Sequence, residues 1–235
     1  MSTSGGATWK ELDKTMDDGA KIAFGSIYQA GCMVDPKTSV RKMAVFKSTD
    51  DGKTWKRTMF EKEEGILKGL IVHPRKKNIL FAGGTLGIYS SNPKSMLYKS
   101  IDAGATWNEI GGLCRKPGGI ESMCFDPANP KRLVVVMKKS IYISEDEGAS
   151  WTPQDIGGTC IVADPVKKGR FFLGSDNGVL VSYDGAKSWK EMSEGLSGRS
   201  ILCIDFDSKN SILYAGTSRA GVVRLSLAGA KLTTK

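Results

Sequence analysis

The segment Ser100-Ile101-Asp102-Ala103-Gly104-Ala105-Thr106-Trp107 contains the pattern that decides the fold. The same pattern, S-x-D-x-G-x-[ST]-W, recurs in residues 48–55 and 144–151. Residues 182–189 repeat it with the glycine one place earlier, and residues 2–9 repeat it with a serine in place of the aspartate. The tryptophans that end successive copies are 46, 52, 44 and 38 residues apart. Spacing of this kind predicts a fold built from repeated supersecondary units.

Each residue type in the pattern has a local structural use. An aspartate carboxylate can accept hydrogen bonds from the backbone N–H groups of the turn that follows it. Glycine takes a positive φ at little cost, and tryptophan buries a large ring as the next strand begins. The pattern therefore predicts a stapled β-hairpin and not a catalytic site. The turn residues are Asp50, Gly52, Trp55, Asp102, Gly104, Trp107, Asp146, Gly148, Trp151, Asp184 and Trp189.

The sequence between the turns predicts four strands per repeat. In four repeats an apolar strand carries a small residue at a fixed position (Gly69, Ser122, Cys160 and Cys203), and further short apolar runs follow it. Antiparallel four-stranded sheets repeated in this way are typical of a β-propeller. We expect an all-β, five-bladed propeller that forms a single domain over residues 1–235. Residues 8–12 are expected to complete the last sheet and close the ring.

The repeated pattern resembles the Asp-box, or bacterial neuraminidase repeat, over nearly the whole chain, which implies a β-propeller. The resemblance extends loosely to the propellers of photosystem II assembly factors, which bind partner proteins without catalysis, and to those of sialidases. A sialidase would need an arginine cluster and a Tyr-Glu pair in a longer chain, whereas the arginines here are few and scattered. The related xyloglucan hydrolases place paired carboxylates between two propellers, and this sequence predicts one propeller.

The positive charge of the chain is concentrated in equivalent turns. The net charge is +9, from 34 Lys and Arg against 25 Asp and Glu. Basic residues follow the first strand of several repeats: Arg75, Lys76, Lys77, Lys131, Arg132, Lys167, Lys168 and Lys209. Equivalent turns lie on one face of a propeller, so these residues predict a basic rim that binds an acidic protein partner. Aromatic residues are not interleaved with them, which argues against nucleic acid as the partner.

Few residues suggest catalysis. The single histidine, His73, stands where other repeats have the aspartate of a turn, so we expect a turn residue. Asp205 stands where other repeats have Ile71, Cys124 and Val162, and it is a candidate polar residue of the central channel. The sequence has no H-E-x-x-H, EF-hand or glycine-rich phosphate motif. We therefore expect no catalytic residue, no metal and no cofactor.

Cysteine usage and hydropathy favour a soluble, cytoplasmic protein. The five cysteines are odd in number and form no C-x-x-C pair, so we expect free, buried thiols in a reducing compartment. Cys160 and Cys203 are expected to be small fillers on buried strands. No apolar stretch approaches the roughly 20 residues that span a bilayer. The first residues have neither the basic nor the apolar region of a signal peptide, although a removed leader is compatible with this.

These observations leave three functional interpretations open. The first is a non-catalytic interaction or assembly scaffold that binds an acidic protein through the basic rim. The second is a glycan-binding or glycoside-hydrolase-related propeller, which rests on the family resemblance alone. The third is an accessory subunit of a larger complex.

Overall fold

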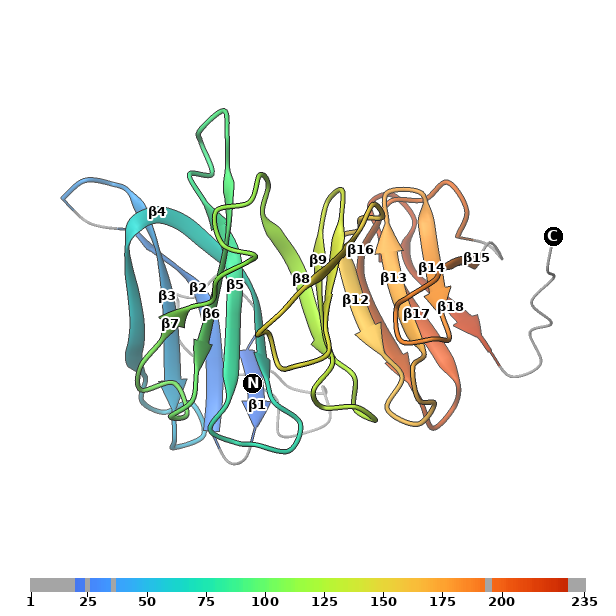
Figure 1. The fold of residues 1–235 in the computed structure, drawn as a ribbon, viewed down its shortest axis with the longest axis horizontal. Coiled ribbons are helices and arrows are strands. Elements are labelled where there is room, and N and C mark those ends of the chain that lie inside the picture. The colour runs from blue at the N-terminus through green and yellow to red at the C-terminus, as the bar shows by residue number, and fades with distance from the viewer. Residues whose placement is uncertain (1–19, 24–25, 35–36, 193–195, 228–235) are drawn as a thin grey trace.

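The protein is all-β in the computed structural model, which describes residues 20–23, 26–34, 37–192 and 196–227. Figure 1 shows the strands running side by side from the blue sheet at one end of the molecule to the red sheet at the other. The strands are β1 (Ala20–Ala23), β2 (Ser26–Val34), β3 (Arg41–Ser48), β4 (Lys56–Val72), β5 (Leu80–Leu86), β6 (Lys94–Ser100), β7 (Asn108–Glu109), β8 (Ile120–Phe125), β9 (Leu133–Met137), β10 (Ile141–Ser144), β11 (Thr152–Gln154), β12 (Cys160–Ala163), β13 (Phe171–Ser175), β14 (Gly178–Ser182), β15 (Lys190–Met192), β16 (Ile201–Asp207), β17 (Ile212–Thr217) and β18 (Gly221–Ser226).

Hydrogen bonding groups these strands into four sheets within the described residues. The sheets contain β1–β7, β8–β11, β12–β15 and β16–β18, and every pairing is antiparallel. The expected all-β class with antiparallel sheets is confirmed. Five separate sheets are not found, and none of the four closes on itself. The segment expected to close the ring, residues 8–12, lies outside the described residues.

The first sheet is wide because β4 belongs to two repeats. The strand begins directly after Trp55, pairs with β3, and then runs without a turn until it pairs with β5. It thus serves as the last strand of one repeat and the first strand of the next. Two of the expected blades are therefore joined into one seven-stranded sheet, which the spacing of the turns could not reveal.

A β-bulge recurs on the first strand of three repeats. The pairing register shifts between Leu67 and Gly69 on β4, between Ile120 and Ser122 on β8, and between Ile201 and Cys203 on β16. The small residues expected on these strands directly follow the bulges.

A salt bridge joins two of these bulges. Lys68 and Glu121 are the inserted residues on β4 and β8, and Lys68 Nζ lies 2.7 Å from Glu121 Oε2. The small residue after the first bulge has a packing reason, because a Cβ on Gly69 would lie 3.0 Å from Cε of Met123. The bulges therefore bring the first strands of neighbouring repeats close together.

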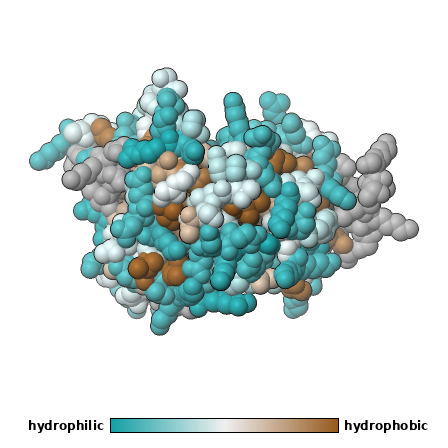
Figure 2. Space-filling view, in the orientation of Figure 1, coloured by the Kyte–Doolittle hydropathy of each residue, from teal (hydrophilic) through white to brown (hydrophobic). Residues whose placement is uncertain are grey.

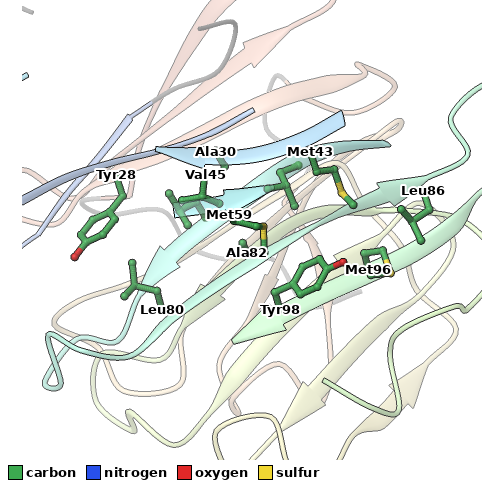
Figure 3. Packing of buried hydrophobic residues seen from close by; sticks show 12 residues of the cluster. Tyr28, Ala30, Met43, Val45, Met59, Leu80, Ala82, Leu86, Met96 and Tyr98 are labelled. Carbon is green, nitrogen blue, oxygen red and sulfur yellow. The ribbon is translucent and has the colours of Figure 1, made fainter. Parts of the chain in front are cut away.

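Hydrophobic clusters fill the space between neighbouring repeats. Figure 3 shows the first cluster, in which Tyr28 and Met43 from β2 and β3 face Leu80 and Tyr98 from β5 and β6. Three further clusters lie between β5–β6 and β8–β9, between β9–β10 and β12–β13, and between β13–β15 and β16–β18. Apolar residues alternate or run continuously along these strands because both faces of an inner sheet are covered.

The outer surface is mainly polar. Figure 2 shows hydrophilic residues over most of one face, with small hydrophobic patches between them. In the part of the chain that the structure describes, no helix is long and apolar enough to cross a membrane.

Candidate functional site

Four tight turns, here called the Asp turns, occupy residues 48–55, 100–107, 144–151 and 182–189 and share one hydrogen-bond network. In the second of them, Ser100 Oγ donates to Asp102 Oδ1 at 2.8 Å and accepts from Gly104 N at 2.8 Å. Asp102 Oδ1 accepts from Thr106 N at 2.8 Å, and Oδ2 accepts from Thr106 Oγ1 at 2.6 Å. The other three turns repeat these four bonds, with Ala186 in place of the glycine in the last.

These bonds hold the turn carboxylates in the ionised state. Hydrogen bonds from the Thr or Ser four residues later lower the pKa of Asp50, Asp102 and Asp146 from 3.8 to about 2. Burial raises the pKa of Asp184, but the bonds from Ser188 outweigh it and bring the value to about 2. A carboxyl that acts as a general acid near neutral pH needs a raised pKa, so the lowered values do not suit that role. The structural role expected for the turn aspartates stays a prediction.

The second and third Asp turns also contact the preceding repeat. A Cβ on Gly104 would lie 3.3 Å from Cε1 of Tyr28, and a Cβ on Gly148 would lie 3.2 Å from Cε1 of Phe81. Both glycines have a positive φ, of 83° and 90°. Glycine is therefore needed twice over, for the backbone conformation and for the close approach of an aromatic ring.

Lysines strengthen the same two contacts. Lys47 Nζ donates to Ala103 O at 3.0 Å, and Lys99 Nζ donates to Glu147 O at 3.0 Å. Their Nζ atoms also lie 5.4 Å and 5.2 Å from the ring centres of Tyr28 and Phe81. The sequence analysis did not single out these lysines, although both immediately precede the first serine of a turn.

Two surface grooves open at these junctions. The smaller, the β3–β4 groove, has a volume of about 310 Å³ and is lined by Lys47, Thr49, Thr54, Trp55, Lys56, Thr58 and Ala105. The larger, the β6–β7 groove, has a volume of about 460 Å³ and is lined by Lys99, Ile101, Asn108, Glu109, Ile110, Gly111, Glu147, Gly148 and Ala149. Small-molecule sites occupy roughly 300–1,000 Å³, so both are large enough for a sugar unit.

The β6–β7 groove combines carboxylate, amide and apolar groups. Asn108 and Glu109 form β7 and are exposed, while Glu147 comes from the Asp turn of the next repeat. A hydrogen bond from Lys76 Nζ, at 2.6 Å, lowers the pKa of Glu147. The apolar side chains of Ile101 and Ile110 complete the lining. The groove can therefore offer hydrogen-bond acceptors and donors beside an apolar surface.

A buried histidine lies behind Glu147. His73 is 1 % exposed, and its Nδ1 accepts hydrogen bonds from Arg75 N at 3.1 Å and Lys76 N at 3.0 Å. Its Nε2 has no hydrogen-bond partner among the described residues and lies 3.7 Å from Glu147 Oε1. Burial lowers the pKa of His73, although the nearby Glu147 carboxylate acts in the opposite direction.

This histidine is expected to make the protein less stable in acid. The folded-state pKa of His73 lies below the unfolded value of about 6.5, so the native state disfavours the protonated ring. The stability that the neutral ring contributes is present above pH 6.5 and is lost as the pH falls through the folded-state pKa. Urea unfolding at pH 8 and pH 5 measures the effect. His73→Asn keeps an acceptor for the two amides and is expected to reduce the pH dependence; an unchanged difference would contradict the assignment.

The basic residues expected on a rim lie in the turns between the first and second strands of their repeats. Two of them are paired. Lys76 Nζ lies 2.6 Å from Glu147 Oε1, and the Arg132 guanidinium lies 2.9 Å from both Asp126 Oδ2 and Glu145 Oε1. Arg75, Lys77, Lys131, Lys167, Lys168 and Lys209 are exposed. These turns lie beside the Asp turns of the same sheet, because Glu147 N donates to Lys131 O and Gly185 N donates to Gly169 O.

Asp205 is exposed on β16 and faces away from the hydrophobic cluster of its sheet. Its Oδ1 accepts a hydrogen bond from Phe206 N at 2.8 Å. Across the sheet it pairs with Tyr214. Among the residues that the structure describes, no hydrogen bond or ion pair joins Asp205 to another predicted site residue. Within the described ranges, no group of three or more His, Cys, Asp or Glu residues could hold a metal ion.

The cysteines differ from the expectation of uniformly buried thiols. Cys203 is exposed, whereas Cys114, Cys124 and Cys160 are half-buried, and all four are free. Burial raises the pKa of Cys114 to about 11 and also raises that of Cys124 and Cys160. Cys203 is exposed because β16 belongs to the last described sheet, and the described residues place no further sheet against its outer face.

The sequence is similar to one family model and to several curated proteins. The family model described as "Sortilin, neurotensin receptor 3" (Sortilin-Vps10) matches residues 43–152. The oligoxyloglucan-reducing end-specific xyloglucanase of Emericella nidulans is 27% identical over 186 residues, which are 67% of this chain and 22% of the relative. Xyloglucanases of Acetivibrio thermocellus and Hypocrea jecorina match at 28% and 22% identity. The chain spans about a fifth of the length of the curated relatives that it matches.

Solved structures support the propeller-like fold. An ancestral GH74 enzyme aligns with a TM-score of 0.63 at 18% identity, over 89% of this chain and 28% of that one. The YCF48 protein bound to a D1 peptide aligns with a TM-score of 0.59 at 13% identity, over 87% of this chain and 60% of that one. At these identities the likeness shows the fold alone.

The leading functional interpretation of the sequence was wrong. A non-catalytic scaffold that binds an acidic protein is not supported, because the curated relatives are named xyloglucanases. The interpretation relied on the net positive charge. That charge does not show that Lys76 and Arg132 are paired with carboxylates of nearby turns.

Proposed function

We propose that this chain is a glycoside-hydrolase-related propeller segment that binds a xyloglucan-type oligosaccharide. The observation that carries the proposal is the 27% identity to an oligoxyloglucan-specific xyloglucanase over 67% of the chain. The β6–β7 groove supports it, because carboxylate and amide groups beside apolar side chains suit the hydroxyls and the C–H faces of a sugar.

The Glu147 carboxylate in the groove favours a binding role over that of a general acid. The lowered pKa of Glu147 keeps this side chain an acceptor for sugar hydroxyls. Glu109 is exposed on the opposite wall, 3.9 Å from Arg115 Nε. Glycoside hydrolysis would need a pair of carboxyl groups, one of them protonated as general acid. We therefore assign the groove to binding, and the activity of the longer relatives stays a property of those proteins.

The test is oligosaccharide binding by the full chain, measured by calorimetry with xyloglucan heptasaccharide. Glu109→Gln is expected to weaken binding about tenfold, because a hydrogen bond to a charged group contributes roughly 1.5–3 kcal/mol. Asn108→Ala is expected to weaken binding about fivefold, because a hydrogen bond to a neutral amide contributes roughly 0.5–1.5 kcal/mol. Glu191→Gln is the matched control, since Glu191 occupies the same place after Trp189 on β15. Absence of binding at millimolar ligand would refute the proposal. Equal effects of the three variants would show that the oligosaccharide does not bind in the β6–β7 groove. A reducing-sugar assay in parallel detects any hydrolysis.

We also propose that the chain forms one domain with five blades in a closed ring. The long strand β4 supports this count, because it supplies one strand to each of two repeats. Counting these two repeats separately, with the sheets β8–β11, β12–β15 and β16–β18, gives five units. A low-resolution electron microscopy projection with five-fold radial density is the expected result.

A further inference from the structure

The β3–β4 groove and the β6–β7 groove occupy equivalent places in neighbouring repeats. Each is lined by the lysine that precedes the first serine of an Asp turn, Lys47 in one groove and Lys99 in the other. Each is also lined by the alanine that follows the glycine of the next Asp turn, which is Ala105 or Ala149. The same backbone frame therefore carries two different sets of side chains, and the differences bear directly on the ligand that each groove prefers.

The carboxylates of the β6–β7 groove have no counterpart in the β3–β4 groove. Glu109 stands two places after a tryptophan, and the same position in the preceding repeat is Arg57. Glu147 directly follows a turn aspartate, and the same position in the preceding Asp turn is Ala103. None of the described residues that line the β3–β4 groove is acidic. The sign of the charge is therefore reversed between two grooves of the same construction.

Two lysines of the β3–β4 groove have donors left for a ligand. Lys56 takes the place of Asn108, directly after the tryptophan, and is exposed. No hydrogen bond or ion pair joins its ammonium group to another residue that the structure describes. Lys47 Nζ donates to Ala103 O at 3.0 Å, which uses one of the three donors of an ammonium group. The groove therefore presents positive charge and free N–H donors to an anionic group.

An aromatic ring and hydroxyl groups complete the lining of the β3–β4 groove. Trp55 is half-buried, and its indole N–H already donates to Gly52 O at 3.1 Å within the Asp turn. The part of the ring that a ligand can reach is apolar, so the C–H face of a pyranose can pack against it. Thr49 and Thr58 stand where the β6–β7 groove has isoleucines. Hydroxyl groups suited to a sugar thus lie beside the ring and the two lysines.

We propose that the β3–β4 groove binds an acidic sugar, with the carboxylate of a uronic acid at Lys56 and Lys47 and its pyranose ring against Trp55. An inorganic anion would use the lysines but not the ring, and a neutral sugar would use the ring but not the charges. The volume of about 310 Å³ is at the lower end of small-molecule sites, which suits one or two sugar units. The inference goes beyond xyloglucan binding, because it concerns a second groove and a different class of saccharide.

An NMR titration of the full chain with cellobiouronic acid and with cellobiose tests the inference. The two disaccharides differ only in a carboxylate that replaces one hydroxymethyl group. The acid is expected to bind about tenfold more tightly, because a charge-assisted hydrogen bond is roughly twice as strong as a neutral one. It is also expected to shift the indole N–H signal of Trp55. Acetate supplies a carboxylate without a ring and is expected to bind more weakly than the acid. Equal affinity for the acid and cellobiose, or for the acid and acetate, would overturn the proposal.

Matched substitutions locate the site. Lys56→Gln is expected to weaken binding of cellobiouronic acid about tenfold and to leave that of cellobiose unchanged, whereas Lys56→Arg keeps the charge and most of the affinity. The control is Lys190→Gln, because Lys190 directly follows Trp189, is exposed and lines neither groove. Equal losses in Lys56→Gln and Lys190→Gln would overturn the assignment to the β3–β4 groove.

The two grooves are tested separately by exchanging ligands and variants. Lys56→Gln is expected to bind xyloglucan heptasaccharide as the unaltered chain does, and Glu109→Gln is expected to bind cellobiouronic acid as the unaltered chain does. If only the heptasaccharide fails to bind, the proposed function is wrong and the acidic-sugar site stands. If only cellobiouronic acid fails to bind, the acidic-sugar site is wrong and the proposed function stands.

Discussion

Replacing Arg170 with methionine is expected to lower the free energy of unfolding by about 3–5 kcal/mol, because it leaves a buried carboxylate without its partner. Arg170 and Asp164 are 7% and 2% exposed, and Arg170 Nε donates to Asp164 Oδ2 at 2.5 Å. The other oxygen of Asp164 accepts from the amides of Val166 and Lys167. Burial raises the pKa of Asp164, but these amides and the guanidinium outweigh it, and the pKa lies below 3.8.

Urea unfolding at pH 7 measures this effect, and its pH dependence gives an independent check. Because the folded-state pKa of Asp164 is lowered, its contribution is present above pH 3.8 and is lost as the pH falls through the folded-state value. The loss caused by Arg170→Met is therefore expected to shrink in acid. Adding Asp164→Asn is the control: it removes the orphaned charge and keeps an acceptor, so it is expected to recover part of the stability. A loss below 1 kcal/mol at pH 7 would show that solvent reaches the carboxylate.

Truncating Phe81 to alanine is expected to cost about 3–5 kcal/mol, because the ring fills the junction between two repeats. Phe81 is fully buried and makes an edge-to-face contact with Phe125, with ring centres 5.5 Å apart. It also lies against Gly148 and beneath the Lys99 ammonium group. Alanine would leave a cavity and remove all three contacts.

Thermal and urea denaturation measure the loss of stability in Phe81→Ala and in the control variant Phe81→Leu. The comparison separates the effect of the lost side-chain volume from the effect of the lost aromatic contacts. Leucine keeps most of the apolar volume, so a smaller loss is expected than for alanine. Equal losses for the two variants would show that the ring contacts outweigh the cavity. Phe81 contacts Gly148 and Lys99, which line the β6–β7 groove, so Phe81→Ala is expected to weaken oligosaccharide binding, whereas Arg170→Met, one repeat away, is not.

The repeated pattern predicted the all-β class, and the reason lies in local chemistry. Ser100, Asp102 and Thr106 bond to one another and to the intervening backbone, so the turn is specified by residues within one short segment. The run Leu133–Met137 forms β9, because a continuous apolar, β-branched run suits a strand covered on both faces.

Features that join distant segments could not be predicted in this way. The continuity of β4 depends on how two repeats meet, and residues 56–72 show no turn signal that assigns them to one repeat or the other. The β6–β7 groove combines Glu109 with Glu147, which belong to different repeats and stand at variable positions of the pattern. Glu147 directly follows the turn aspartate, and Glu109 stands two places after the tryptophan. A comparison of these variable positions among the repeats was the sequence signal that could have identified the two groove carboxylates.

The unbroken course of β4 has a mechanical consequence. Peeling this strand away from β3 also strains its bonds to β5, since one length of backbone carries both ladders. The first two repeats are thus joined by one continuous strand, whereas the later sheets are connected to one another through loops. We therefore expect relative motion between repeats to be largest after residue 109. Strands β2–β7 are expected to move together as one unit.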